Sequence, residues 1–400
     1  MPKTILCIAS YEKGQAFLRQ AKEEGWRVLL LTSKSLENAD WPKGSIDNIY
    51  FIPDVNKEWK MDDVIHGVSY LARSVNIDRI VALDDFDVEK AAALREHLRV
   101  PGMGDTTARY FRDKLAMRMK ARESGINVPD FIGIINHDKI REFLAKVNPP
   151  YVLKPRLQAG ATGIRKILSP DDLWKNLDEL GDRQSFYLLE KFVPGEIFHV
   201  DSILVNKQVL FSIVSKYGLP PMEVAHEGRV FTTRTISLGS EDEVSLQQLN
   251  KSVLPSLGLL HGVSHTEYIK GRDDGRFYFL ETSARVGGAH IADLIEAATG
   301  LNLWAEWAKL ETSEDYSRYS PKPLRQVYAG LLVSLAKQEY PDMEAYNDPE
   351  VFLKIKKLHH AGLVLRSEKF ERVEELLKNY TERFYNDFFT SAPPKEKPNF

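Results

Sequence analysis

Short apolar runs and longer stretches with a helical period alternate along the first hundred residues. The apolar runs have the length of buried strands, and the stretches between them repeat their apolar residues every three or four positions. Strands that alternate with helices in this way predict a parallel α/β layer. The predicted strands lie at 3–9, 27–31, 49–52 and 79–83, and the predicted helices lie at 14–24, 62–75 and 88–98.

The pattern changes after the glycines and proline of residues 101–104. One long helix is predicted at 106–124, and a long loop rich in Gly, Pro, Glu and His at 216–231. A hairpin is expected at 203–210, around the turn at Asn206. Further strands are predicted at 151–154, 165–168, 186–192, 198–205, 325–336 and 362–366, and further helices at 170–180, 243–257, 290–299 and 367–388.

Residues 265–285, HTEYIKGRDDGRFYFLETSAR, predict a two-stranded hairpin with one acid on each strand. With the turn centred on Asp274, Glu267 and Glu281 are equally distant from the centre and face each other, with Cβ atoms roughly 5 Å apart. Two carboxylates so placed repel each other, and a divalent cation such as Mg²⁺ would convert the repulsion into coordination. The hairpin alone is equally compatible with two solvated acids on an exposed face.

Composition narrows the class of protein. The 400 residues carry a formal net charge of −3, which gives no electrostatic case for nucleic acid. The single cysteine, Cys7, lies in an apolar run and excludes an internal disulfide. His261 and His265 lack a third metal ligand at helical spacing. No apolar run reaches membrane-spanning length and no signal peptide is evident, so we expect a soluble, cytoplasmic protein without a membrane partner.

A loop of small residues, QAGATGI at 158–164, joins two predicted strands. Its backbone N–H groups could close around phosphate oxygens, and Lys154 on the preceding strand could add a positive charge. The loop is not a Walker A motif, because no Gly-Lys-Ser/Thr follows. A flexible hairpin tip beside a solvated lysine is the alternative interpretation.

Three further features suit a nucleotide. The strand end from Glu190 to Val193 could offer its backbone to an adenine edge, and Glu196 could accept hydrogen bonds from ribose hydroxyls. Arg285, just beyond the second acidic strand, could hold a phosphate or carboxylate beside a metal. Taken singly, these residues are equally an ordinary strand end, a turn and a surface arginine.

In this order and spacing, these motifs resemble the ATP-grasp superfamily, and most closely its carboxylate–amine ligases of the amino-acid-ligase and biotin-carboxylase-like branch. The resemblance covers roughly residues 1–370, including LREHLRVPGM at 94–103. It implies an α/β and α+β protein with the ATP-grasp fold and an N-terminal Rossmann-like domain. The implied units are residues 1–104, a central small subdomain at 105–195, a large subdomain at 196–390 and a disordered tail at 391–400.

The resemblance also implies roles for individual residues. Glu267 and Glu281 would hold Mg²⁺ or Mn²⁺, while Arg285 and Lys154 would be catalytic through the transferred phosphate. The loop at 159–163 would close over the β- and γ-phosphates of ATP. The implied nucleotide-binding residues are Lys114, Lys154, Gly160, Thr162, Gly163, Glu190, Lys191, Val193 and Glu196.

One position departs from the family pattern, since Ser283 stands where many members carry an Asn metal ligand. A hydroxyl is a shorter and weaker ligand, so the number of metal ions stays open. Substrate recognition is assigned to four residues of two loops, namely His226, Arg229, Gly287 and Gly288.

The implied activity is ATP-dependent ligation of a small carboxylic acid to an amine through an acyl-phosphate, with release of ADP and phosphate. A biotin-carboxylase-like or kinase-like enzyme of the same fold is one alternative, and a catalytically silent ATP-binding protein is another. A homodimer is compatible with the fold. The sequence does not indicate which acid and amine are joined.

Overall fold

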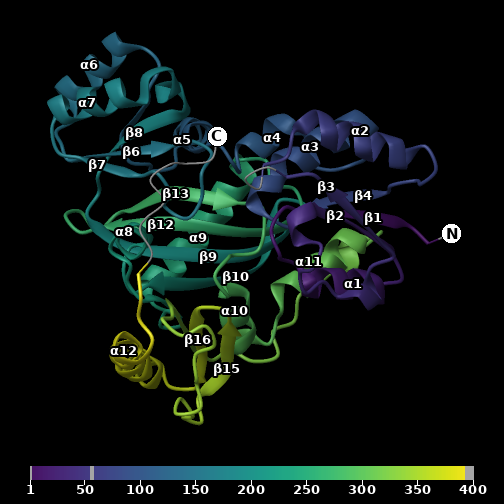
Figure 1. Cartoon of the computed structure of the whole chain (residues 1–400). Helices are drawn as coiled ribbons and strands as arrows, with labels where there is room; N and C mark the ends of the chain where they lie inside the picture. The colour runs from purple at the N-terminus through teal and green to yellow at the C-terminus, as the bar shows by residue number, and fades with distance from the viewer. Residues whose placement is uncertain (1, 55–57, 392–400) are drawn as a thin grey trace.

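The computed structural model describes residues 2–54 and 58–391, and within helix α8 it leaves the side chain of His226 outside the description. Three sheets organise the chain (Figure 1). The predicted tail at 391–400 lies outside the described residues apart from its first position. Within the described ranges, no helix combines the length and the apolarity that crossing a membrane requires.

The N-terminal sheet is the parallel α/β layer that the hydrophobic pattern predicts. Every residue of strand β1 (Thr4–Ala9), one of the two central strands, is buried, as expected for a parallel strand covered on both faces. Its strands follow the order β3 (Asn48–Ile52), β2 (Arg27–Ser33), β1 (Thr4–Ala9) and β4 (Arg79–Ala82), and its helices are α1 (Gln15–Glu23), α2 (Met61–Ala72) and α3 (Val88–Leu98).

A second, antiparallel sheet forms the lobe at the upper left of Figure 1, where helices α6 and α7 lie together. The cluster of buried apolar residues shared by these helices and strands is separate from the other cores. The strand order is β5 (Phe131–Gly133), β8 (Tyr187–Lys191), β6 (Tyr151–Pro155) and β7 (Arg165–Ile167), with α6 (His137–Lys146) and α7 (Pro170–Leu180) beside them.

The single long helix predicted at 106–124 is wrong, because the chain forms two helices there. Helix α4 (Asp105–Arg109) ends early, and α5 (Lys114–Glu123) begins after Asp113, whose side chain accepts hydrogen bonds from the amides of Leu115 and Ala116. Asp113 is therefore an N-cap, which satisfies amide groups that have no partner in the first turn. The cap places Lys114 at the first position of the new helix.

The third sheet has eight antiparallel strands and carries most of the remaining chain. Its strands follow the order β13 (Phe277–Ser283), β12 (Gly262–Gly271), β9 (Gly195–Val205), β10 (Gln208–Tyr217), β11 (Phe231–Thr235), β14 (Tyr328–Leu335), β16 (His360–Ser367) and β15 (Val351–Lys357). The helices of this region are α8 (Pro221–Glu227), α9 (Glu241–Ser256), α10 (Ile291–Thr299), α11 (Leu303–Thr312) and α12 (Phe370–Asp387).

The connection between β10 and β11 differs from the long loop predicted at 216–231. Strand β10 continues to Tyr217, and α8 occupies most of the interval before β11. Proline and glycine residues mark the two ends of this short helix, which explains why the composition suggested a loop. The predicted hairpin before it is confirmed, with Asn206 and Lys207 both in the left-handed region of the backbone map.

Helix α11 links the N-terminal layer to the eight-stranded sheet. It packs against α1, where the rings of Phe17 and Trp307 meet edge to face at 5.2 Å. One continuous core runs from the buried face of β1 through these helices to β9 and β12. The N-terminal layer and the eight-stranded sheet are thus held together by apolar packing.

The acidic hairpin forms with Glu267 directly opposite Glu281, as predicted, but by a different route. A turn centred on Asp274 would place Leu280 opposite Tyr268, but Tyr268 faces Phe279 instead. Near the turn, the register is therefore shifted by one residue from the predicted one. A β-bulge at Leu280 adds the missing residue and restores the register. The opposition of the two acids is therefore set by the bulge together with the turn, and not by the turn alone.

Arg118 of α5 stabilises this bulge. Its guanidinium donates to the carbonyl of Leu280 and also forms an ion pair with Glu190, with 2.5 Å between Nε and Oε1. Arg118 is fully buried. A bulge leaves part of a strand ladder unpaired, so a buried donor at this carbonyl removes the cost of an unsatisfied group.

Replacing Arg118 by methionine keeps the length of the side chain but leaves the buried carboxylate of Glu190 with one cation fewer. We expect the free energy of unfolding to fall by about 3–5 kcal/mol, measured by urea denaturation. The matched control is Lys120→Met on the same helix, where the surface ion pair with Glu123 is worth no more than about 1 kcal/mol. Equal losses in the two variants would contradict the buried role of Arg118.

Candidate functional site

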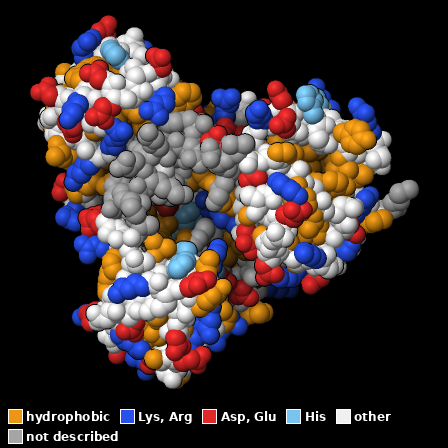
Figure 2. All heavy atoms as spheres, in the orientation of Figure 1, with side chains coloured by type: hydrophobic (Ala, Val, Ile, Leu, Met, Phe, Trp, Pro, Cys, Tyr) orange, Lys and Arg blue, Asp and Glu red, His pale blue; other side chains and the backbone are white. Residues whose placement is uncertain are grey.

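A cleft of about 880 Å³ lies where the three sheets approach one another. One wall comes from the segments that follow β1 and β4, another from the small-residue loop, and the floor from β10, β12 and β13. Acidic and basic side chains intermingle on the coloured part of the face in Figure 2, which agrees with the small net charge. The cleft contains both charged and aromatic groups, as small-molecule sites do.

Both acids of the hairpin line this cleft. Glu267 accepts a hydrogen bond from the hydroxyl of Tyr217 at 2.8 Å, and Glu281 forms an ion pair with Lys114 at 2.9 Å. Lys114 also donates to the backbone carbonyl of Gln158 at 2.6 Å. The cap at Asp113 is the reason that this lysine reaches the acidic strand and the small-residue loop together.

Lys154 and Glu190 form a buried ion pair, with 2.5 Å between Nζ and Oε2. Burial lowers the pKa of Lys154 to about 8, although the charge of Glu190 opposes this effect. Burial by itself would raise the pKa of Glu190, but Arg118 and Lys154 outweigh it and lower that pKa. A carboxylate held between two cations fixes where both cations lie, and the lysine remains the one that titrates most easily.

The loop of small residues has the backbone that its composition favours. Gly160, Ala161 and Gly163 have φ values of 66°, 60° and 71°. Nothing lies within 4 Å of a Cβ built on Gly160, so glycine is favoured there by conformation and not by crowding. Gly160 and Thr162 line the cleft, which brings this backbone to the same space as Glu267 and Glu281.

The remaining nucleotide candidates lie outside this cleft. The ammonium of Lys191 donates to the carbonyl of Asn148 at 2.5 Å, and Val193 packs near Gly271. Glu196 pairs with Lys216 at 2.5 Å, and both line a second cavity of about 430 Å³.

Tyr217 lines both cavities and stands between them. The structure therefore brings Lys114, Lys154 and the two acids together, and places Glu196 in the neighbouring cavity. A nucleotide that reached from one cavity to the other would have to pass beside the Tyr217 ring.

Arg285 lines the cleft beside a carboxylate that the sequence did not single out. Its Nε lies 3.8 Å from Oδ1 of Asp85, in the 3₁₀ helix Asp85–Asp87 that follows β4, while Arg112 contacts the other oxygen of Asp85 at 2.5 Å. Burial would raise the pKa of Asp85, but Arg112, Arg285 and Ser283 outweigh it and hold that pKa at about 2. Neither Asp85 Oδ1 nor Arg285 Nε has a hydrogen-bond partner among the described residues. These two buried groups therefore still have bonding capacity at the cleft.

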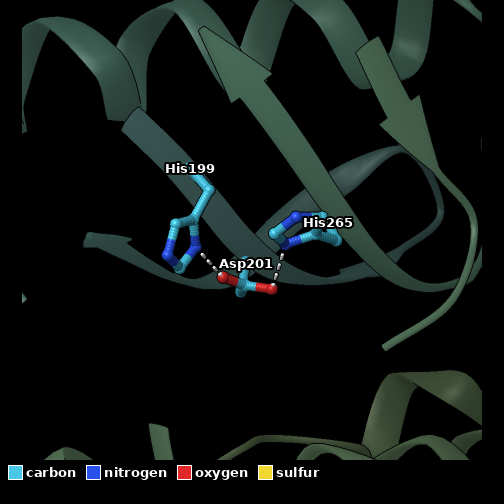
Figure 3. Close-up of side chains that lie close together, drawn as sticks. All are labelled: His199, Asp201 and His265. Carbon is cyan, nitrogen blue, oxygen red and sulfur yellow. Dashed lines mark hydrogen bonds and ion pairs between the residues drawn. The ribbon is translucent and has the colours of Figure 1, made fainter. Parts of the chain in front are cut away.

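Two histidines and an aspartate form a buried cluster (Figure 3), and Nε2 of His265 lies 3.6 Å from Oε1 of Glu267. Asp201 separates the rings of His199 and His265. Ligands at helical spacing do not reveal this cluster, because His199 and Asp201 alternate along β9 and His265 faces Asp201 from β12. Burial lowers the pKa of His199. Burial also opposes protonation of His265, but Asp201 outweighs it and raises the pKa of His265 to about 9.

The four residues assigned to substrate recognition do not all line the cleft. Gly288 lines the cleft, and Gly287 packs against the histidine–aspartate cluster. Arg229 is exposed and pairs with Glu227 at 2.9 Å, and it is absent from the residues that line the cleft. The side chain of His226 lies outside the described residues, although its helix contributes Val224 and Ala225 to the cleft wall.

The donor set in the cleft suits a hard divalent cation. Glu267 and Glu281 stand directly opposite each other on neighbouring strands, and oxygen ligands are those that Mg²⁺ prefers. Ser283 also lines the cleft, so a hydroxyl is the group available at that position. Three cations lie near the acids and are available for an anionic ligand: Lys114 pairs with Glu281, Arg285 lines the same cleft, and Lys154 is close enough to feel the charge of Glu281.

Comparison with known proteins identifies the fold. The chain has the ATP-grasp fold, and the proteins that it is similar to include L-amino acid ligases. It superposes on an L-amino acid ligase from Bacillus licheniformis with a TM-score of 0.75 and 17% identity, over 97% of this chain and 98% of the other. No family model matches the chain.

Two further proteins are similar to this chain, one in structure and one in sequence. The biotin carboxylase domain of a 2-oxoglutarate carboxylase from Hydrogenobacter thermophilus, in complex with MgADP, ADP and bicarbonate, superposes with a TM-score of 0.72 and 17% identity over 95% of this chain and 89% of that one. In sequence, the chain is 27% identical over 277 residues to an L-arginine-specific L-amino acid ligase from Bacillus subtilis. That match covers 67% of this chain and 65% of the ligase.

The lowered pKa of Lys154 predicts a stability effect with a definite sign. Between about pH 8 and 10.5 the unfolded chain holds the lysine proton that the folded chain has released, so the free energy of unfolding rises with pH. The contribution is at most about 1.4 kcal/mol per pH unit. Urea denaturation across this range should show a steeper rise for the unaltered protein than for Lys154→Met. Parallel pH profiles would contradict the shift.

Proposed function

We propose that this protein is an ATP- and Mg²⁺-dependent ligase that joins a small carboxylic acid to an amine and releases ADP and phosphate. The observation that carries the proposal is the direct opposition of Glu267 and Glu281 on the floor of a cleft that Arg285 also lines, with Lys114 paired to Glu281. Two carboxylates in this arrangement repel each other unless a cation lies between them. The MgADP complex of one structural neighbour supports the same choice of cofactor.

In this proposal the triphosphate lies between the small-residue loop and the acidic hairpin. Lys114 and Lys154 attract the phosphate oxygens, and the backbone of the loop at 159–163 closes over them. Glu267 and Glu281 hold the cation, which when bound would neutralise charge that develops on the transferred phosphoryl group. We assign the adenine to the Glu190–Val193 strand end and the ribose to Glu196 in the neighbouring cavity.

The proposed reaction has two steps. A carboxylate oxygen of the acid attacks the γ-phosphorus, the bond to the β-phosphate oxygen breaks, and ADP leaves. The amine nitrogen then attacks the carbonyl carbon of the acyl-phosphate, the bond to the phosphate oxygen breaks, and the nitrogen gives up a proton. Arg285, which lines the cleft, would stabilise the transferred phosphate in both steps. A cleft closed by the loop protects the acyl-phosphate from water.

The cleft wall suggests the size of the acid and amine. Tyr11 and Phe86 lie with ring centroids 5.6 Å apart, and Phe231 and Ile291 line the same space. A wall of this kind suits organic substrates with side chains better than it suits bicarbonate, which is small and fully polar. Amino acids are the first substrates to test, with arginine among them because the Bacillus subtilis relative is specific for it.

The three units expected from the sequence belong to the same proposal. Residues 1–104 would contribute the wall beyond β1 and β4, residues 105–195 the phosphate loop, and residues 196–390 the metal site. Each unit would then carry one part of the site, so that the approach of the units completes it.

A substrate screen tests the function directly. The protein is incubated with ATP, Mg²⁺ and pools of amino and other carboxylic acids with amines, and the release of ADP and phosphate is measured. Release should require both an acid and an amine, and the amide product should appear in equal amount. Release with bicarbonate alone would favour the carboxylase alternative. ATP binding without turnover on any pool would favour the catalytically silent alternative.

The acidic pair gives a sharper prediction. Glu281→Gln should lower turnover by about 100-fold or more, because the amide is neutral and leaves the phosphoryl charge less well compensated. Binding of ATP, measured by calorimetry, should change much less. Asp273→Asn in the exposed turn of the same hairpin is the control and should keep full activity. Retained turnover in Glu281→Gln would overturn the role given to the pair.

A further inference from the structure

At the floor of the cleft and behind it lies a set of polar side chains to which the proposed reaction gives no role. His199 and Asp201 of β9 are completely buried, and His265 of β12 is 8% exposed. A charged or polar group in such a place costs free energy unless its partners are well arranged. The arrangement of these three residues is therefore the feature to explain.

The carboxylate of Asp201 takes one hydrogen bond on each of its oxygens. Nδ1 of His199 lies 2.7 Å from Oδ2, and Nδ1 of His265 lies 2.9 Å from Oδ1 (Figure 3). At its far side the ring of His199 is fixed by Thr233, with 2.8 Å between Nε2 and Oγ1. His199 is thus held at both ring nitrogens, and it anchors Asp201 on the side away from the cleft.

The other ring reaches the metal-site acid. With Nδ1 engaged by Asp201, Nε2 of His265 faces the cleft, 3.3 Å from the hydroxyl of Tyr217 and 3.6 Å from Oε1 of Glu267. The same hydroxyl donates to Oε1 of Glu267 at 2.8 Å. A continuous chain of contacts therefore runs from the buried aspartate to the carboxylate that faces Glu281.

The backbone also holds this pair in place. A Cβ on Gly287 would lie 3.0 Å from Oδ1 of Asp201 and 3.0 Å from Nδ1 of His265. Because Gly287 has no side chain, the segment after β13 can pack directly against the hydrogen bond between Asp201 and His265. The ring of His265 consequently has little room to rotate about its own axis.

We propose that Asp201 is a positioning residue of the cation site, which holds His265 so that its Nε2, together with Tyr217, fixes the Glu267 carboxylate toward the cation. Buried partners of this kind orient the groups that contact a metal, and their loss commonly weakens metal affinity 10- to 100-fold. The proposal rests on the proposed function for the identity of the site as a divalent-cation site. It adds a residue that contacts neither the nucleotide nor the cation.

The test measures cation binding without turnover. Asp201→Asn is nearly identical in shape, but an amide offers one acceptor oxygen where the carboxylate offers two. Mn²⁺ binding to the protein with ADP is followed by electron paramagnetic resonance, and ADP binding without metal by calorimetry. We expect Mn²⁺ affinity to fall about 10-fold or more and metal-free ADP affinity to stay within about twofold.

The matched control lies on the same strand. Ser202 is equally buried but faces the opposite side of the sheet, where Asn250 donates to its hydroxyl at 2.8 Å. Ser202→Ala removes a buried hydrogen bond without touching His265, so Mn²⁺ affinity should stay unchanged. An equal loss of Mn²⁺ affinity in Asp201→Asn and Ser202→Ala would mean that the effect is general destabilisation, and would overturn the proposal.

A second variant keeps the test decisive if Asp201→Asn does not fold. His265→Gln breaks the same chain one step nearer the cation and should weaken Mn²⁺ binding to a similar degree. Unaltered Mn²⁺ affinity in either folded variant would overturn the positioning role while leaving the cation site intact. If the unaltered protein bound no Mn²⁺ in the presence of ADP, the proposed function itself would fail, so the two failures are distinguishable.

Discussion

The repulsion between Glu267 and Glu281 is the constraint on which the rest of this site depends. The chain compensates the two carboxylates separately: Tyr217 and His265 contact the first, and Lys114 forms an ion pair with the second. Neither set of partners comes from the opposite strand, so each acid is compensated on its own side. In the proposed function, a divalent cation between the two carboxylates would relieve the repulsion that remains.

Buried charge also connects the sheets that surround the cleft. Glu190 holds Lys154 and Arg118 on one side, and Asp85 holds Arg112 and faces Arg285 on the other. Ion pairs of this kind add little to stability against apolar replacements, but they are costly to break one partner at a time. Their value here is geometric, because each carboxylate fixes the cations that border the cleft at positions contributed by different parts of the chain.

Local patterns predicted much of this molecule, and long-range pairing explains what they did not. The parallel layer and the glycine loop follow from periodicity and composition, whereas Glu267 faces Glu281 as predicted only because the bulge at Leu280 corrects the register of the turn. The break between α4 and α5 depends on the Asp113 cap, which a helical period running through it conceals. The cluster around Asp201 is invisible to spacing rules, because β9 and β12 meet across about sixty residues of chain. Asp85 was missed for the same reason: its partners lie on other elements.

The bulge at Leu280 lies between the turn of the hairpin and the two acids, and it changes the strand register by one residue there. In an unbroken ladder, a change of one residue in the turn would reverse every side chain up to the acids. Here one extra residue at the bulge shifts the register between the turn and the acids, so a one-residue change in the turn would need a matching change at the bulge to keep Glu267 opposite Glu281. Because the carbonyl freed at the bulge is held by Arg118, a displacement of α5 would reach the acidic strand through its backbone and not through its side chains. The acidic strand is thus connected through its backbone to the helix that carries Lys114.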